Sequence, residues 1–238
     1  MTGNKSNAII VGICLIIALS SLGYLLGDAA IRFKEYERTV TVKGLSEREY
    51  KADIVIWPIQ FSAASNDLEA MYKSIDDSTQ KIQSFLITSG IDGDAISYSS
   101  PAITDKSAQQ YGSQERAEFR YTAYQTVTVY STDIEVVQQV MGKMSDLGKQ
   151  GIVFTGNNYQ MQTEYIFNRL NQVKPEMIEE ATTKAREVAE KFASDSNSRL
   201  GKIKSASQGQ FSISARDKNN PHIKKVRVVS TVAYYLSD

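Results

Sequence analysis

Side chains that could do acid–base, nucleophilic or metal chemistry are few and scattered in this chain. The 238 residues include one histidine, His222, which follows Asn219–Pro221 in a predicted turn, and one cysteine, Cys14. Neither residue has a partner at the spacing of a His/Cys metal site. A serine nucleophile would have no evident base other than His222. We therefore interpret His222 as an exposed loop residue.

The acidic residues do not form a site either. The pairs Asp76–Asp77 and Glu179–Glu180 are adjacent on predicted helices, so the two members of each pair point in different directions. The segment Asp92–Asp94 resembles the start of a calcium loop but lacks the later ligands, and a turn explains it better. The sequence contains no P-loop, G-x-S-x-G or H-E-x-x-H motif. We predict no catalytic, cofactor-binding or metal-binding residue, and a hydrolase is the least supported function.

The N-terminal segment is the most informative part of the sequence. Ile9–Leu26 is an almost unbroken apolar run, with no charge between Lys5 and Asp28. A membrane span needs roughly 20 mostly apolar residues, so residues 8–28 are predicted to form a transmembrane anchor. The alternative is a cleaved signal, which has a shorter apolar region and a small-x-small site. Asp28 disfavours the one candidate site.

Charge does not decide how this anchor is oriented. Lys5 lies before the apolar run, whereas Arg32, Lys34 and Arg38 follow it. The count of basic residues favours a cytoplasmic body. A short N-terminal segment followed by one apolar run is, however, typical of an export signal. We favour export of the body.

Composition limits what the body can bind. Lys and Arg together number 27, as do Asp and Glu, so the net charge is zero and no basic surface for nucleic acid is expected. Cys14, in the apolar run, is the only cysteine, so no intrachain disulfide can form. The roughly 200 residues after the run fit one large or two small domains.

Periodicity predicts an α+β fold with largely antiparallel sheets, in which hairpins alternate with three amphipathic helices, plus the N-terminal transmembrane helix. The predicted helices cover residues 67–89, 133–147 and 175–194. The predicted strands cover residues 39–43, 50–64, 95–104, 119–130, 152–154, 158–167, 203–215 and 226–236. Gly44 is expected to end the first strand, and residues 105–118 are expected to form an exposed loop.

Two strands have informative patterns. Residues 50–64 are apolar on both faces, which predicts a strand covered on both sides, with Pro58 at an edge or bulge. Residues 119–130 alternate regularly, with Phe119 on the apolar face. The tyrosines Tyr121, Tyr124 and Tyr234 could line a ligand pocket or simply pack on strand faces.

Four sequence blocks in this order resemble the SIMPL-domain family, also known as DUF541. They are VTVKGLSE at Val40–Glu47, KADIVI at Lys51–Ile56, LITSGIDGDAI at Leu86–Ile96, and EATTKAREVAEKFA at Glu180–Ala193 followed by LGKI at Leu200–Ile203. The family usually has Pro-Asp where this chain has Ala52–Asp53. The resemblance extends from Thr39 to Leu236.

The resemblance implies an exported bacterial protein of α+β fold without a known catalytic motif, in a family with some links to stress tolerance. We divide the chain into a tail (1–7), an anchor or signal (8–28), a juxtamembrane linker (29–38) and a SIMPL-like domain (39–238). We expect a non-enzymatic, single-pass protein of the bacterial inner membrane with its domain in the periplasm, forming a homo-oligomer or binding a protein partner. A periplasmic module that binds a small ligand is the alternative.

Overall fold

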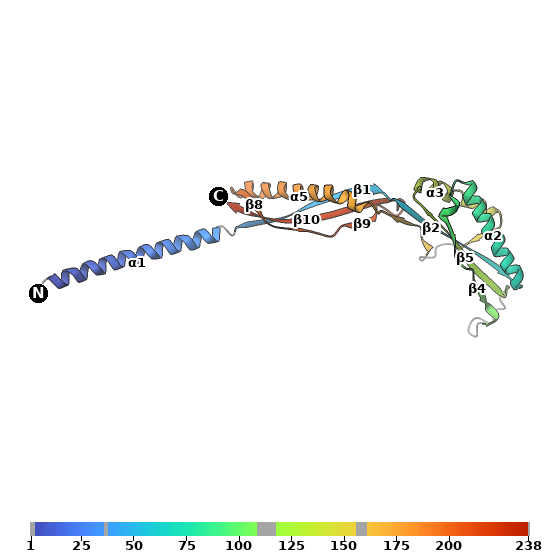
Figure 1. The fold of residues 1–238 in the computed structure, drawn as a ribbon, viewed down its shortest axis with the longest axis horizontal. Coiled ribbons are helices and arrows are strands. Elements are labelled where there is room, and N and C mark those ends of the chain that lie inside the picture. Colours follow the sequence, from blue (N-terminus) through green and yellow to red (C-terminus); the bar gives the residue numbers. More distant parts are fainter. Residues whose placement is uncertain (1–2, 36–37, 109–117, 156–160, 238) are drawn as a thin grey trace. The chain divides into compact units, whose positions relative to one another are not determined.

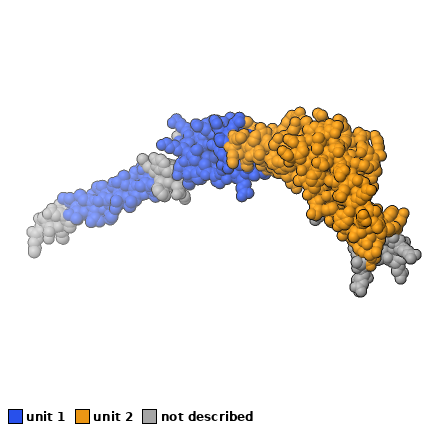
Figure 2. Space-filling model, turned by 45° about the vertical axis from the view of Figure 1, so that its right-hand side comes forward, with its two compact units in different colours: residues 1–47, 173–212, 227–238 blue, residues 48–172, 213–226 orange. Residues whose placement is uncertain are grey.

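The computed structural model describes residues 3–35, 38–108, 118–155 and 161–237. The chain divides into two compact units, which Figure 2 colours separately. Unit 1 contains residues 1–47, 173–212 and 227–238, and unit 2 contains residues 48–172 and 213–226. Figure 1 labels the helices and strands along the chain.

Helix α1 (Gly3–Glu35) contains the apolar segment. Within it, Ile10–Ile31 is a stretch of 22 residues with a mean hydropathy of 2.3, and none of it is buried. A helix of this length and composition can cross a membrane, and a signal sequence near an N-terminus has the same properties. The predicted N-terminal apolar helix is therefore present, and it extends beyond residues 8–28 at both ends.

The remaining elements of unit 1 are long strands and one helix. Strand β10 (Ile223–Ser237) lies between β1 (Thr39–Lys51) and β8 (Arg199–Gln208), and the short β9 (Ser212–Ala215) also pairs with β10. Helix α5 (Leu170–Asp195) covers one face of the sheet formed by β1, β10 and β8 (Figure 1). The end of β1, the start of β10 and most of β9 belong to unit 2.

All pairings in this sheet that the hydrogen bonds define are antiparallel. The register of β10 and β8 is antiparallel from Ser230 and Gln208 onward. On the other side of β10, the Leu236 amide donates to the Arg38 carbonyl, and near the opposite end of β1 the Ala52 amide donates to the His222 carbonyl. From the first of these hydrogen bonds to the second, the residue number rises on the β1 side, from 38 to 52, and falls on the β10 side, from 236 to 222. The two strands are therefore antiparallel as well.

Small residues allow α5 to lie very close to the sheet. Its buried positions recur at every fourth residue, at Met177, Ala181, Ala185, Ala189 and Ala193. A Cβ at Gly44 of β1 would lie 1.8 Å from the Ala181 carbonyl oxygen and 2.5 Å from the Ala185 amide nitrogen. The prediction that Gly44 ends the first strand is therefore wrong. The strand continues to Lys51, because Gly44 makes room for the helix and does not form a turn.

Unit 2 is built on a second, six-stranded antiparallel sheet. Its strands are β2 (Ile54–Ser65), β3 (Ile96–Tyr98), β4 (Ala102–Asp105), β5 (Tyr121–Ser131), β6 (Val153–Phe154) and β7 (Glu164–Ile166). Its helices are α2 (Leu68–Thr88), α3 (Ile134–Met141) and α4 (Met144–Lys149), with short 3-10 turns at Gly93–Ala95 and Lys106–Ala108. Strands β2 and β5 pair along their whole length and are the centre of the sheet.

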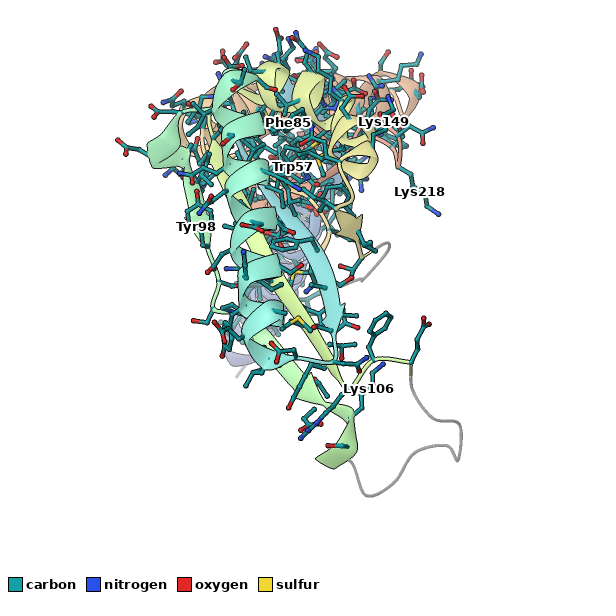
Figure 3. All side chains as sticks on the ribbon, turned by 90° about the vertical axis from the view of Figure 1, so that its right-hand side faces the viewer. Trp57, Phe85, Tyr98, Lys106, Lys149 and Lys218 are labelled. Atoms are coloured by element: carbon teal, nitrogen blue, oxygen red, sulfur yellow. The ribbon has the colours of Figure 1, made fainter. Side chains whose placement is uncertain are left out.

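The core of unit 2 contains large side chains. Strand β2 contributes Val55, Trp57, Ile59 and Phe61, which are all buried on one face. Figure 3 places Trp57 in this interior, whereas Lys106, Lys149 and Lys218 project from the surface. Burying each such apolar side chain stabilises the fold by about 1.5–3 kcal/mol. The opposite face of β2 is partly buried, so the prediction of a strand that is covered, at least in part, on both sides is confirmed.

Pro58 lies where β2 has a partner on one side only. It is opposite Thr128 of β5. On the other side, β7 pairs with Ile54–Ile56 and β6 pairs with Phe61–Ser62, so Pro58 falls in the gap between them. This confirms its predicted position at an edge, where a missing N–H breaks no pairing.

Several predicted boundaries are wrong for identifiable reasons. The helix predicted over residues 133–147 is two helices, α3 and α4, which are separated at Gly142 and Lys143 because glycine is a poor helix former. Helix α5 begins at Leu170, so Pro175 lies inside the helix and not in its first turn as predicted. Phe119 precedes β5 and is exposed.

Two predictions fall partly on residues outside the described ranges. Of the loop predicted over residues 105–118, residues 109–117 are not described. Of the strand predicted over residues 158–167, residues 158–160 are not described, and β7 forms its later part. The fold class is nevertheless the predicted α+β class with antiparallel sheets.

The substitution Gly44→Ala should destabilise unit 1 strongly. The new Cβ would overlap the backbone of α5, and overpacking of this kind costs about 1–3 kcal/mol or more. We expect a clearly lower midpoint when thermal unfolding of the detergent-solubilised chain is followed by circular dichroism. Gly148→Ala is the control, because a Cβ there has nothing within 4 Å. Equal midpoints for the two variants would contradict the close contact.

Candidate functional site

Both outer strands of the unit 1 sheet have a free edge. In the order β1–β10–β8, β10 has a partner on each side, whereas β1 and β8 each have a partner on one side among the described residues. A free edge presents N–H and C=O groups with which another strand can pair. Because β1 and β8 are both antiparallel to β10, they run in the same direction.

Hydrogen bonds show which residues of β1 face this free edge. Backbone groups of successive residues point to alternate sides of a strand. Arg38 accepts from Leu236 over 2.9 Å and Ala52 donates to His222 over 2.8 Å, so even-numbered residues face β10 at both ends of β1. Thr41, like the other odd-numbered residues, therefore directs its N–H and C=O toward the free edge.

Two exposed apolar side chains on α5 lie beside the β1 edge. Glu180, Lys184, Val188 and Phe192 recur at every fourth residue, as the buried stripe does, so they share one side of the helix. The Ser46 hydroxyl of β1 donates to Glu180 over 2.8 Å, which places this side of the helix toward β1. Val188 is 41% and Phe192 57% exposed. A strand paired with β1 would cover them.

Strand β8 carries an exposed apolar side chain on the same face of the sheet. Ile203 is 51% exposed and pairs with Tyr234, which is buried beneath α5. The hydrogen bond between the Leu236 amide and the Arg38 carbonyl fixes the register of β10 and β1. In antiparallel strands this register places Val40 opposite Tyr234. Ile203 and Val40 therefore lie at the same level of the sheet, on its two outer strands.

Phe192 lies close to this level as well. Ala185 of α5 contacts Gly44, and beyond the end of α5 the Ser198 hydroxyl accepts a hydrogen bond from Arg38 over 3.1 Å. Phe192 lies between these two contacts, near the start of β1. The two free edges thus each carry an apolar group at one height along the strands: Phe192 beside β1 and Ile203 on β8.

His222 is not the exposed residue that the sequence suggested. It is in the predicted turn, but it is only partly exposed. Its ring packs against Tyr165, with centroids 6.0 Å apart and planes tilted by 59°. Its Nδ1 atom is buried without a hydrogen-bond partner among the described residues. The prediction of simple exposure is therefore wrong, because Tyr165 is distant in sequence and only folding brings it to His222.

The turn before His222 is held by one carboxylate. Asp217 Oδ1 accepts from the amides of Asn219 and Asn220, each over 2.9 Å. The Arg216 guanidinium donates to Asp217 Oδ2 over 2.8 Å. The hydrogen bonds from Arg216 and from the Asn220 side chain lower the pKa of Asp217 to about 2. The ionised carboxylate thus shapes the loop that leads to His222.

The other acidic residues considered in the sequence are either exposed on a helix or bonded to neighbouring residues. Asp76 and Asp77 are both exposed on α2. Asp92 caps the short turn that follows, and its side chain accepts from the Asp94 amide over 3.1 Å, so the turn interpretation is confirmed. Glu180 contacts Ser46 and forms an ion pair with Lys184, which a sequence pattern alone does not reveal.

The three tyrosines that were candidates for a ligand pocket are divided between the two units. Tyr234 belongs to unit 1, where it lines a groove of about 410 Å³ between α5 and β8. Tyr121 and Tyr124 belong to unit 2. Tyr121 lies under the Arg120 guanidinium at 4.8 Å, and Tyr124 is exposed. Packing on strand faces describes these three residues better than an aromatic pocket.

A comparison with known families agrees with this architecture. A family model described as SIMPL, protein of unknown function (DUF541), matches residues 40–232. No curated protein matches the chain.

Removing the Asp217 side chain should loosen the turn before His222. We expect Asp217→Ala to speed hydrogen exchange at the Asn219 and Asn220 amides several-fold, because each amide loses its acceptor. Asp217→Asn, which keeps an oxygen acceptor, should retain most of the protection. Exchange followed by mass spectrometry or NMR measures this.

Lowering the pH should also loosen the turn before His222, because acid protonates the Asp217 carboxylate. The folded pKa of about 2 is below the ordinary 3.8, so the stabilising contribution is present above about pH 3.8 and is lost as the pH falls toward 2. Protection in Asp217→Ala equal to that of the unmodified chain would show that the carboxylate does not hold the turn.

Proposed function

The chain belongs to the SIMPL family of proteins of unknown function (DUF541), and we propose that it is a membrane-anchored protein whose body assembles with further copies of itself. The observation that carries this proposal is the pair of free, parallel edges in one sheet, each with an exposed apolar side chain at the same level. Assembly would pair the β1 edge of one copy with the β8 edge of the next.

The anchor supports this arrangement. Strand β1 begins four residues after α1 ends, so the start of the strand lies within about 14 Å of the helix end. Copies anchored in one membrane would therefore all have β1 starting on the membrane side. The β1 strand of one copy and the β8 strand of its neighbour would then meet as parallel strands, without inverting either copy.

Apolar contact would make the pairing selective. A neighbouring β8 strand would bring its Ile203 toward Val188 and Phe192 and cover all three side chains. Lys202 and Lys204 also lie on β8, and lysines on an edge strand discourage indiscriminate pairing. The contact joins two different surfaces, so it would form a closed ring or an open row, depending on the rotation between copies. Tethering would raise the local concentration and favour assembly through weak contacts.

The remaining features of the proposal come from the sequence and the family. Residues 8–28 would be an uncleaved single-pass anchor in the bacterial inner membrane, with residues 29–38 as linker and 39–238 as one periplasmic domain. The protein would have no enzymatic activity and would act in tolerance of envelope stress, alone or with a protein partner.

Substituting Phe192 by lysine should prevent assembly. We expect the unmodified chain in detergent to have a mass above that of the monomer by light scattering, and Phe192→Lys to be monomeric with unchanged thermal unfolding. Ile87→Lys is the matched control, because Ile87 is also an exposed apolar residue on a helix but lies in unit 2. Thr41→Pro removes an N–H of β1 that faces the free edge, so this variant should also be monomeric.

Two outcomes would contradict assembly through these edges. One is a monomeric unmodified chain at high concentration. The other is an assembly that persists in both Phe192→Lys and Thr41→Pro.

The anchor should keep the mature protein in the membrane. We expect the chain to stay in the membrane fraction after washing with high salt and alkaline carbonate, because these washes do not remove a helix whose apolar run, Ile9–Leu26, is buried in the hydrocarbon core. N-terminal sequencing of this material should begin at Met1 or Thr2. Recovery of soluble protein beginning near Ala29 would show a cleaved signal instead.

A further inference from the structure

Unit 2 contains a pocket that the proposed assembly does not use. Its volume is about 390 Å³, within the range of about 300–1,000 Å³ typical of small-molecule sites. Three segments that are distant in sequence form its walls: the end of β1, the start of α3, and the turn at His222. The lining residues are Lys51, Ala52, Thr132, Asp133, Ile134, Glu135, Gln138 and His222.

Hydrogen bonds hold these walls in place. The Ala52 amide donates to the His222 carbonyl over 2.8 Å and joins the first and third segments. Asp133 Oδ1 accepts from the Val136 amide over 3.1 Å and fixes the start of α3. The His222 ring packs against Tyr165. The pocket is thus formed before any ligand arrives.

One exposed ion pair lies in the lining of the pocket. Lys51 Nζ lies 2.7 Å from Glu135 Oε1, and the two side chains are 73% and 71% exposed. The hydrogen bond and the charge of Glu135 raise the pKa of Lys51, so the ammonium stays protonated. Ion pairs this exposed contribute little to stability, so either group can exchange its partner at little cost.

The full set of charges is one ammonium and two carboxylates, since Asp133 lies beside Glu135 in the lining. Ile134 and Ala52 add apolar surface, and the Thr132 hydroxyl and the Gln138 amide add hydrogen-bonding groups. The described part of the chain places no three His, Cys, Asp or Glu residues as metal ligands. This set favours a small organic ligand that carries both charges.

We propose that this pocket binds a small zwitterion with a free ammonium and a free carboxylate, such as a short peptide with an apolar side chain. The ligand carboxylate replaces Glu135 as the partner of Lys51. The ligand ammonium lies between Glu135 and Asp133. The apolar side chain of the ligand contacts Ile134 and Ala52.

Titration calorimetry on the full chain in detergent tests the proposal, with the dipeptide Ala-Leu as probe. Two blocked forms separate the charges: N-acetyl-Ala-Leu lacks the ammonium, and Ala-Leu amide lacks the carboxylate. We expect Ala-Leu to bind and each blocked form to bind at least about tenfold more weakly, a difference of about 1.4 kcal/mol.

Variants assign the charges to residues. Lys51→Met should weaken Ala-Leu about tenfold but leave the already weak amide form unchanged, because that form has no carboxylate for Lys51 to bind. Glu135→Gln should also weaken the binding of Ala-Leu, but it should leave the binding of N-acetyl-Ala-Leu unchanged, because that form has no ammonium for Glu135 to bind. Lys149→Met is the control, because Lys149 forms a comparable exposed ion pair with Asp146 at 2.9 Å outside the pocket.

Three results would overturn the proposal. The first is absence of binding by Ala-Leu at about 10 mM, which corresponds to less than about 3 kcal/mol of affinity. The second is equal binding of Ala-Leu and its amide, which would indicate a site for simple cations. The third is a loss of affinity in Lys149→Met as large as that in Lys51→Met.

Discussion

The close contact between α5 and β1 at Gly44 determines the arrangement of unit 1. The helix backbone approaches the strand so closely that a single Cβ would overlap it. The residues of α5 that lie against the sheet are mostly alanines, Ala181, Ala185, Ala189 and Ala193. The Ser46–Glu180 hydrogen bond is made beside this contact, and Arg38 and Ser198 join beyond the end of the helix.

Exposed apolar side chains lie beside the buried stripe of α5. Val188 and Phe192 each precede a buried alanine and remain exposed next to β1. Among the described residues, β1 has no partner strand on that side. A free edge and an apolar row therefore lie together, and a strand from another copy could satisfy both at once.

Unit 2 achieves its packing in a different way. Its core is filled by large side chains from β2, β5 and α2, among them Trp57, Phe61, Met71 and Leu86. Such a core does not depend on small residues at every fourth position of a helix. In this unit, Lys51, Asp133 and Glu135 line one pocket together with His222. Assembly and ligand binding would thus use different units of one chain.

The sequence by itself determined the apolar N-terminal helix, the α+β class and the family, because these depend on composition, periodicity and ordered blocks of residues. Helix stripes such as Ile75, Ile82 and Leu86 and the inward face of β2 were predictable for the same reason. Local patterns failed where a distant segment decided the outcome. Gly44 reads as a strand break, and its role depends on α5, more than 130 residues away along the chain.

Only the tertiary structure decided which residues meet. His222 appears isolated in the sequence, yet folding places it in one pocket with Lys51 and Glu135. Phe192 and Ile203 look like ordinary core positions, and only the strand order shows that they lie beside free edges. The physical reason is that period and composition report how a segment is buried on average, whereas pairing and helix placement determine which neighbour covers it.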